Sequence, residues 1–269
     1  MRKNILKYYS DLPVKSISEE QREILDYLKK HPVKIFPYAF TKKYRSNKIQ
    51  VYTDEKMQLH YVLHNQKKLF FKRGWTKNDI RNNYKDLLIE QDKQSPHKYL
   101  SNEFQININS IIVDVGSAEG SFALDAIDKI SKIYLFETDL QWIEALQATF
   151  APWAHKVHII NKFVSGQDDD NNITLDKYFE NDEQIDFIKI DVDGAEMELL
   201  KGADKILNKK NSLKIAICTY HNQDDEEAFT KILKDTNFKV RPSNGYMIYY
   251  YHTEFNPPFL RRGLIRAEK

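Results

Sequence analysis

The sequence predicts an α/β protein with a mostly parallel sheet that ends in an antiparallel hairpin, preceded by a small N-terminal α+β module. Three observations support this prediction. From about residue 105 onward, strand-like and helix-like segments alternate along the chain. The strand-like segments are nearly continuous apolar runs, which is typical of parallel strands covered on both faces. The last two strand-like segments are joined by a short turn and not by a helix.

The first part of the chain predicts a helix, a small meander and a second helix. Residues 17–31 place apolar side chains on one helical face, with Ser18 as the N-cap. Residues 48–75 alternate apolar and polar side chains and contain two turn signals, which indicates antiparallel strands. Thr76 is placed to cap the helix that follows. We therefore expect residues 1–95 to form an N-terminal module and residues 96–269 a second domain.

The second domain contains five predicted parallel strands. Helical segments separate them, so the chain crosses over between one strand and the next. The predicted strands are 110–116, 132–139, 156–165, 185–192 and 213–221. The predicted hairpin pairs 238–242 with 246–254 through the turn Ser-Asn-Gly.

Composition and charge exclude several classes of protein. The one cysteine, Cys218, excludes an intramolecular disulfide and is typical of a cytoplasmic protein. We expect no signal peptide and no membrane-spanning helix, because no long apolar run is present.

Charge is unevenly distributed along the chain. Residues 1–100 carry 22 basic against 11 acidic residues, whereas residues 101–269 carry 19 against 28. A nucleic-acid arm is one interpretation of this asymmetry, and a lysine-rich solvated face is the favoured one, because the lysines are spread out.

The first parallel strand ends in a turn that has the character of a cofactor loop. Gly116 and Gly120 leave room for backbone to approach a ligand, and a helix begins just after them. The dinucleotide fingerprint needs a middle glycine where this chain has Ala118. Asp114 and Glu119 flank the turn, and their carboxylates would repel a pyrophosphate but tolerate a sulfonium cation. The turn therefore favours S-adenosylmethionine over a nicotinamide dinucleotide.

An acidic residue also ends the second strand. Glu137 follows Asp114 by 23 residues, and an acid at this position can accept hydrogen bonds from ribose hydroxyls. Its alternative role would be to cap the next helix. Asp139 already stands at the capping position, so we expect Glu137 to bind the ligand.

The fourth and fifth strands end in candidate catalytic residues. Asp193 and Glu196 have the spacing of a capping box at the start of a helix, which leaves Asp191 without a partner at the strand tip. His221 follows the neighbouring fifth strand and should lie beside Asp191. The two could accept a substrate proton, or they could hold a divalent ion together with Asn222.

These motifs together resemble the FkbM-type family of S-adenosylmethionine-dependent methyltransferases. The resemblance spans about residues 90 to 250 and is carried by VDVGSAEGSFAL, YLFETD, TLDKYF and above all IKIDVDGAEMELLKGA. It implies a class I methyltransferase fold with a seven-stranded sheet. It also implies transfer of a methyl group to an oxygen, often on a saccharide or another hydroxylated natural product. One departure is Asp193, where the family more often has Glu.

The resemblance also implies roles for individual residues. The expected cofactor-binding residues are Asp114, Gly116, Ser117, Glu119, Gly120, Glu137, Val164, Ser165 and His97. Val164 and Ser165 would lie at the adenine edge, and His97 lies in a lead-in segment expected to line the pocket. Asp191 and His221 are the expected catalytic residues. A divalent metal is possible but is not strongly indicated, and no metal ligand is assigned.

Other functions are weaker interpretations of the same residues. A nucleic-acid methyltransferase would explain the basic N-terminal part, although the fourth strand lacks the motif typical of base methylation. A catalytically inactive module that binds S-adenosylmethionine would keep the same pocket. We expect a saccharide or small-molecule acceptor as partner and no membrane. Nucleic acid is not favoured as a partner, and a homo-oligomer is an open alternative.

Overall fold

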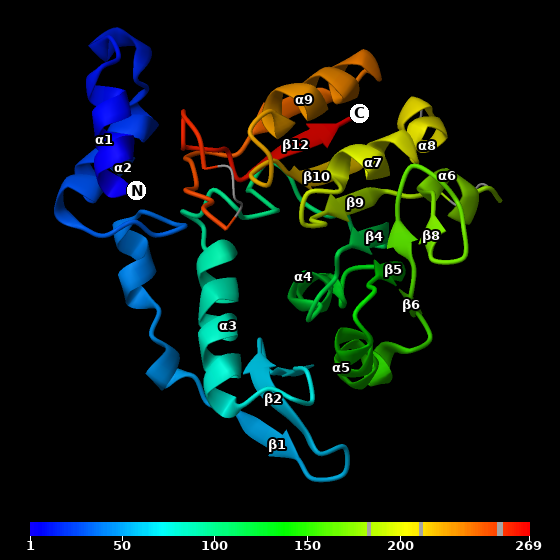
Figure 1. The fold of residues 1–269 in the computed structure, drawn as a ribbon. Helices are drawn as coiled ribbons and strands as arrows, with labels where there is room; N and C mark the ends of the chain where they lie inside the picture. The colour runs from blue at the N-terminus through cyan, green and yellow to red at the C-terminus, as the bar shows by residue number, and fades with distance from the viewer. Residues whose placement is uncertain (182–183, 210–211, 252–254) are drawn as a thin grey trace.

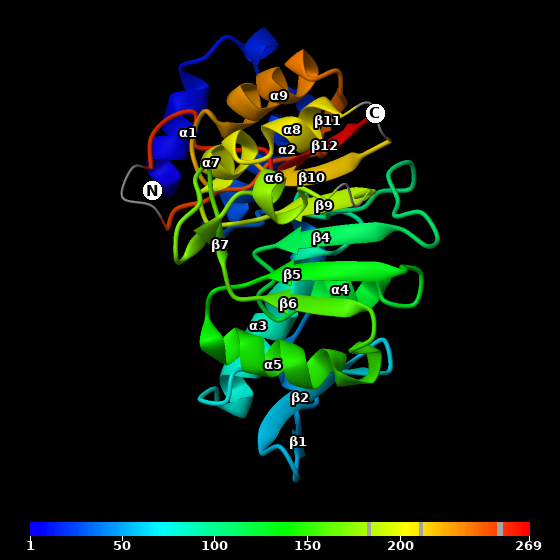
Figure 2. The ribbon, with the colours of Figure 1, turned by 90° about the vertical axis from the view of Figure 1, so that its right-hand side faces the viewer.

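The core of the protein is a seven-stranded sheet with the strand order β11-β12-β10-β9-β4-β5-β6. The computed structural model describes residues 1–181, 184–209, 212–251 and 255–269. Figure 2 shows the strands stacked from β11 to β6. Their bounds are β4 Ile111–Val115, β5 Lys132–Phe136, β6 Val157–Ile160, β9 Phe187–Ile190, β10 Lys214–Cys218, β11 Lys239–Pro242 and β12 Leu264–Glu268.

The directions of the strands confirm the predicted fold class. Strands β10, β9, β4, β5 and β6 pair in parallel, each with its neighbour. Strand β12 runs antiparallel to both β10 and β11. The chain therefore has the class I methyltransferase fold, a mostly parallel seven-stranded sheet with antiparallel strands at its C-terminal end.

The partner predicted for the antiparallel pair is wrong. Strand β11 pairs with Leu264–Glu268 and not with residues 246–254. In the predicted partner segment, Met247 forms only an isolated bridge with Arg261, and residues 252–254 lie outside the described residues. The actual strand is short and carries Arg266 and Glu268 among its apolar residues, so its sequence does not have the pattern of a buried strand.

Helices cover both faces of the sheet, because successive strand residues point to opposite faces. On one face lie α4 Ser121–Ala126 and α5 Leu140–Phe150, which share a hydrophobic cluster with Ile112 and Ile133. On the other face, Val113 and Ile188 belong to a second cluster. That cluster takes its helical members from α6 Leu175–Tyr178, α7 Glu196–Lys201, α8 Asp204–Asn208 and α9 Asp225–Asp235.

The N-terminal module has the predicted two helices and meander, and it also has a first helix, Arg2–Ser10, that was not predicted. Its helices are α1 Arg2–Ser10, α2 Glu19–Lys30 and α3 Lys77–Glu90, and its meander consists of β1 Tyr52–Asp54, β2 Leu59–His64 and β3 Lys67–Phe70. Ser18 and Thr76 cap α2 and α3, each in a capping box. The order is completed by the short elements η1 Val14–Ser16, η2 Ala39–Lys43, η3 Ser46–Lys48, η4 Ala151–Trp153, β7 Phe163–Val164 and β8 Asn172–Ile173.

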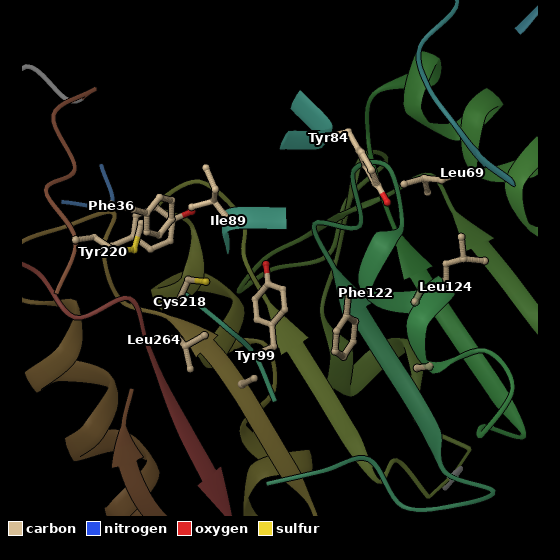
Figure 3. Packing of buried hydrophobic residues seen from close by; sticks show 14 of the residues in the cluster. Phe36, Leu69, Tyr84, Ile89, Tyr99, Phe122, Leu124, Cys218, Tyr220 and Leu264 are labelled. Atoms are coloured by element: carbon tan, nitrogen blue, oxygen red, sulfur yellow. The ribbon is translucent and has the colours of Figure 1, made fainter. Parts of the chain in front are cut away.

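The module packs on the sheet through the first hydrophobic cluster. Leu69 and Ile89 of the module belong to the same cluster as Phe122 and Cys218 of the second domain, and Figure 3 shows these side chains together. Helix α3 runs from the meander toward the end of the sheet (Figure 1). The division at residue 95 into two units stays a prediction. Among the described residues, no helix has the length and apolar character needed to cross a membrane.

Candidate active site

A cavity of about 470 Å³ lies at the carboxyl ends of the parallel strands, where ligands bind in open α/β sheets. Four of the predicted site residues line it, namely Gly116, Glu137, Val164 and Asp191. The same walls include Lys72, Ala118, Trp142, Lys162, Phe163, Val192, Asp193 and Tyr220. The strand tips therefore bring residues from distant parts of the sequence to one cavity.

The glycines of the first turn are needed for different reasons. Gly116 has φ +75°, and a Cβ there would meet the Asp191 carbonyl oxygen at 1.9 Å. Gly120 has φ +81°, and a Cβ there would meet Leu146 Cδ2 at 2.7 Å. The close approach that requires Gly116 is thus to the end of β9, and the one that requires Gly120 is to α5. Among the described residues, Gly116 lines the cavity and Gly120 does not, so a ligand contact at Gly120 stays a prediction.

A smaller cavity of about 100 Å³ lies on the other side of the turn and collects buried charges. It is lined by Asp114, Ser117 and Glu119 of the predicted set, together with Glu90 and Lys189. Burial raises the pKa of Asp114 to about 6 and that of Glu90 to about 7. The two cavities share Gly116, Ala118 and Asp191.

Lys189 is the buried cation among these acids, and sequence reasoning missed it. Its Nζ lies 3.0 Å from Asp114 Oδ1 and donates a hydrogen bond to the Gly116 carbonyl. The side chain is 5% exposed. A lysine inside the apolar strand Phe-Ile-Lys-Ile was the signal that could have identified it, because a buried lysine needs a charge partner.

Glu137 is fixed by the backbone around it. One carboxylate oxygen accepts from the Ala118 N–H at 2.8 Å, and the other accepts from the N–H groups of Thr138 and Asp139 at 2.7 and 2.9 Å. Each carboxylate oxygen has two acceptor sites, so the side chain can still accept from a ligand in the cavity. Asp139 caps α5 through Gln141 N–H, as predicted.

Val164 and Ser165 differ in their positions. Val164 lines the cavity. Ser165 instead lies against the end of α7, because its carbonyl oxygen would be 2.0 Å from a Cβ on Gly202. Only the first of these two candidates is therefore in the cavity wall.

Asp191 has several partners, so the prediction that it is unpartnered is wrong. Tyr99 Oη donates to it at 2.7 Å and Tyr220 Oη at 3.2 Å. His97 Nε2 lies 3.5 Å from its Oδ2. Burial opposes ionisation, but hydrogen bonding and charge from His97, with charges from Lys189 and His221, lower the pKa of Asp191 well below its usual range. Asp191 is therefore ionised at neutral pH.

His97 itself is almost fully buried beside Asp191 and Cys218. Its Nε2 is 3.6 Å from Cys218 Sγ, and the side chain is 2% exposed. Neither of the two cavities includes it among the described residues that line them. Tyr99, two residues later, contacts Asp191 directly, and sequence reasoning did not identify this tyrosine.

The predicted capping box at Asp193 and Glu196 is wrong. Helix α7 begins at Glu196, and its N-cap is Ala195 with no side-chain cap. Asp193 has φ +51°, and its side chain is 99% exposed. Glu196 is fully buried, accepts from Val192 N–H at 3.0 Å, and lies 2.9 Å from His221 Nδ1. The exposed Asp193 therefore does not cap α7, and the buried Glu196 pairs with His221 Nδ1.

His221 lies beside Asp191, as predicted from the neighbouring strands. Its Nε2 is 3.8 Å from Asp191 Oδ1 and 3.5 Å from Asp193 Oδ1. The side chain is fully buried and, among the described residues, is not part of the wall of either cavity. Burial disfavours its charge, but hydrogen bonds to Asp193 and Glu196 outweigh this and raise the pKa of His221 to about 10.

Among the described residues, two groups of side chains offer metal-ligating atoms within 4.8 Å of one another. They are His97, Asp191 and Cys218, and Asp191, Glu196 and His221. In the second group, Glu196 lies beside Nδ1 of His221, whereas Asp191 lies on the opposite edge of the ring, beside Nε2. A single ion coordinated at about 2.0–2.6 Å would have to draw carboxylates from both edges of the ring together. The described geometry therefore resembles a charge-paired histidine more than a metal centre.

The chain matches the sequence model of the methyltransferase FkbM domain over residues 77–240, which is more than half of its length. A search of curated proteins found no match. Many solved structures match the fold.

Three of these structures illustrate the similarity. A methyltransferase FkbM from Methylobacillus flagellatus has a TM-score of 0.49 at 15% identity, with 72% of this chain and 54% of that chain covered. A precorrin-6y C5,15-methyltransferase from Geobacter metallireducens has a TM-score of 0.41 at 14% identity, with 61% and 84% covered. A protein from Streptococcus mutans in complex with SAH has a TM-score of 0.42 at 21% identity, with 61% and 90% covered. The chain thus spans about half the length of the FkbM structure.

Proposed function

The chain belongs to the FkbM methyltransferase family, and from this premise we propose that it is an S-adenosylmethionine-dependent O-methyltransferase. Its proposed acceptor is a hydroxyl of a saccharide or of another hydroxylated metabolite. The observation that carries the proposal is the cavity between the strand tips, which has Glu137 on one side and Asp191 on the other.

The residues of the two cavities fit S-adenosylmethionine. Glu137 would accept hydrogen bonds from the ribose, and Gly116 and Val164 would form the adjacent walls. Glu90, Asp114 and Glu119 surround the single cation Lys189 in the smaller cavity. Such an excess of carboxylates would suit the ammonium group of the cofactor, and Asp191 between the cavities would suit its sulfonium.

The bound cofactor supplies an activated methyl group, so the chain itself has to orient the acceptor and take up its proton. Asp191 is proposed to accept a hydrogen bond from the acceptor hydroxyl, in an orientation fixed by Tyr99 and Tyr220. Its low pKa makes it a weak base but a good hydrogen-bond acceptor. Its negative charge would also stabilise positive charge that develops on the attacking oxygen.

His221 is proposed to act as the base through Asp191. It is protonated at neutral pH in this structure, so it can accept a proton only after it has released one. That proton would pass to solvent before methyl transfer, and the pKa of His221 would fall near a bound cation, because like charges in a buried site oppose each other. A neutral His221 could then take up the acceptor proton as the new carbon–oxygen bond forms.

Three aromatic residues, Trp75, Tyr220 and Tyr246, are candidates to contact a ring-shaped acceptor, and their positions differ. Tyr220 lines the cavity. Trp75 packs on Phe71 and Trp142, and Tyr246 lies under the Arg262 guanidinium. Tyr220 is therefore the one of these three aromatic candidates that we propose to contact the acceptor.

The experiment is a methyl-transfer assay with a panel of saccharides and hydroxylated metabolites, read by mass spectrometry. The wild type should raise the mass of at least one acceptor by about 14 daltons, the gain when a methyl group replaces a hydrogen. Asp191→Ala should lose turnover while it still binds S-adenosylhomocysteine. Unchanged turnover in Asp191→Ala would refute the assigned role. Cofactor binding without turnover on any acceptor would favour an inactive binding module.

The alternative of a nucleic-acid methyltransferase rests on the basic first hundred residues. It predicts binding to RNA or DNA that weakens steeply as salt rises. A homo-oligomer is an open alternative, a cytoplasmic location belongs to our proposal, and a divalent metal requirement also stays open. Size-exclusion chromatography tests the first of these, and turnover after treatment with EDTA tests the last.

A further inference from the structure

The segment between β3 and α3 crosses the edge of the larger cavity, although it lies outside the matched residues 77–240. Two adjacent basic residues in this segment contact α5 and the loop before it. Lys72 Nζ lies 2.5 Å from Asp139 Oδ2, and Arg73 Nη2 lies 2.5 Å from Glu144 Oε1. The ion pairs are alike in type, but only Lys72 lines the cavity.

Lys72 is also the better enclosed of the two. Its side chain is 17% exposed, against 49% for Arg73. Its Nζ lies 4.7 Å from the centroid of the Trp142 ring and 5.8 Å from that of Trp75. Cation–π contacts and partial burial strengthen an ion pair relative to one in open solvent. Lys72 therefore holds a defined position at the cavity wall.

A chain of contacts connects Lys72 to the residue proposed to bind ribose. Asp139 Oδ2 accepts a hydrogen bond from Lys72 Nζ, and Asp139 Oδ1 caps α5. The Asp139 N–H donates to Glu137 Oε1, and Glu137 Oε2 accepts from the Ala118 N–H of the glycine turn. A shift of Asp139 would thus change the position of the Glu137 carboxylate.

We propose that Lys72 is a positioning residue of the N-terminal module that fixes Glu137 and completes the nucleoside side of the cofactor cavity. This inference rests on the proposed function. It gives the module a role in cofactor binding that the matched domain alone does not supply. It also predicts that the role belongs to Lys72 and not to the docking of the module in general.

The test compares Lys72→Met with Arg73→Met in the full chain. Calorimetry measures the Kd for S-adenosylhomocysteine and for adenosine, and thermal unfolding measures the ligand-free protein. Lys72→Met should weaken both ligands about tenfold, and Lys72→Arg should recover most of the loss. The Kd values of Arg73→Met should stay within about twofold of those of the wild type. This should hold even if its unfolding temperature falls as far as that of Lys72→Met.

Several outcomes would overturn the inference. Wild-type affinity in Lys72→Met would exclude a positioning role, while the proposed function would stand if the wild type binds S-adenosylhomocysteine. Equal weakening in Arg73→Met would show that general docking of the module matters, and not Lys72. Failure of the wild-type protein to bind either ligand would refute the proposed function, and this inference with it.

Discussion

Lys189 determines the charge balance of the buried site. It is the cation between Asp114 and the turn carbonyl of Gly116, and its ammonium also lies 5.4 Å from the centroid of the Tyr99 ring. Removing one partner of a buried ion pair leaves the other charge uncompensated in a medium of low dielectric constant. The contribution of Lys189 should therefore be seen in stability before it is seen in catalysis.

Lys189→Met should lower the free energy of unfolding by about 3–5 kcal/mol, because Asp114 is left buried without its partner. Urea unfolding at pH 7 measures the loss. The double variant Lys189→Met with Asp114→Asn should recover a large part of it, because it buries no unpaired charge. A single variant as stable as the wild type would show that the pair is not coupled to folding.

His221 should make stability depend on alkaline pH. Its pKa is raised from the ordinary 6.5 to about 10 in the folded chain, so its protonated form stabilises the fold. That stability is fully present below pH 6.5 and is lost as pH rises through 10. The effect is on the order of 5 kcal/mol, because the pKa rises from 6.5 to about 10 and one pKa unit corresponds to about 1.4 kcal/mol.

The measurement is urea unfolding of the wild type and His221→Asn at pH 6, 8 and 10. The wild type should lose stability between pH 6 and 10, and the variant should be less stable at pH 6 with a smaller further loss. Parallel curves for the two proteins would contradict the assignment of a charged His221.

At the scale of elements, the sequence predicted the five parallel strands because they are nearly continuous apolar runs. The predicted third strand, 156–165, was too long, since β6 ends at Ile160 and Phe163–Val164 pairs with β8 in another sheet. It could not predict the partners of Asp191, since Tyr99 is 92 residues away and reaches the site only through the fold. The capping box failed because the exposed side chain of Asp193 does not cap α7. Strand β12 was missed because charged residues interrupt its apolar pattern.

The turn after β4 and the end of β9 are in contact, and Gly116 makes that contact possible. Gly116→Ala should destabilise the protein by at least about 2 kcal/mol, because alanine is strained at φ +75° and its Cβ would overlap the Asp191 carbonyl. It should also displace Asp191 and weaken binding of S-adenosylhomocysteine.

Gly74→Ala is the matched control, since a Cβ there would meet nothing within 4 Å. Thermal unfolding and calorimetry of both variants make the comparison. Equal effects at the two glycines would contradict the argument from close approach.

At the scale of the whole molecule, the N-terminal module and the sheet share one hydrophobic cluster that reaches from Ile5 to Leu264. The sequence predicted the elements of the module except the first helix, α1. It did not predict this extensive packing, because a helical stripe does not show what covers it. The module's charge excess was visible in the sequence. Its role as a lid, as a substrate-selecting element or as an oligomer contact stays a prediction.

The central claim is that the cavity at the strand tips binds S-adenosylmethionine through Glu137. The most direct measurement is calorimetry with S-adenosylhomocysteine and with NAD⁺, on the wild type, Glu137→Ala and Glu144→Ala. Glu144 is an acid on α5 that, among the described residues, does not line the cavity. We predict micromolar binding of S-adenosylhomocysteine alone, lost in Glu137→Ala and kept in Glu144→Ala. Binding of NAD⁺, or unchanged affinity in Glu137→Ala, would contradict the account.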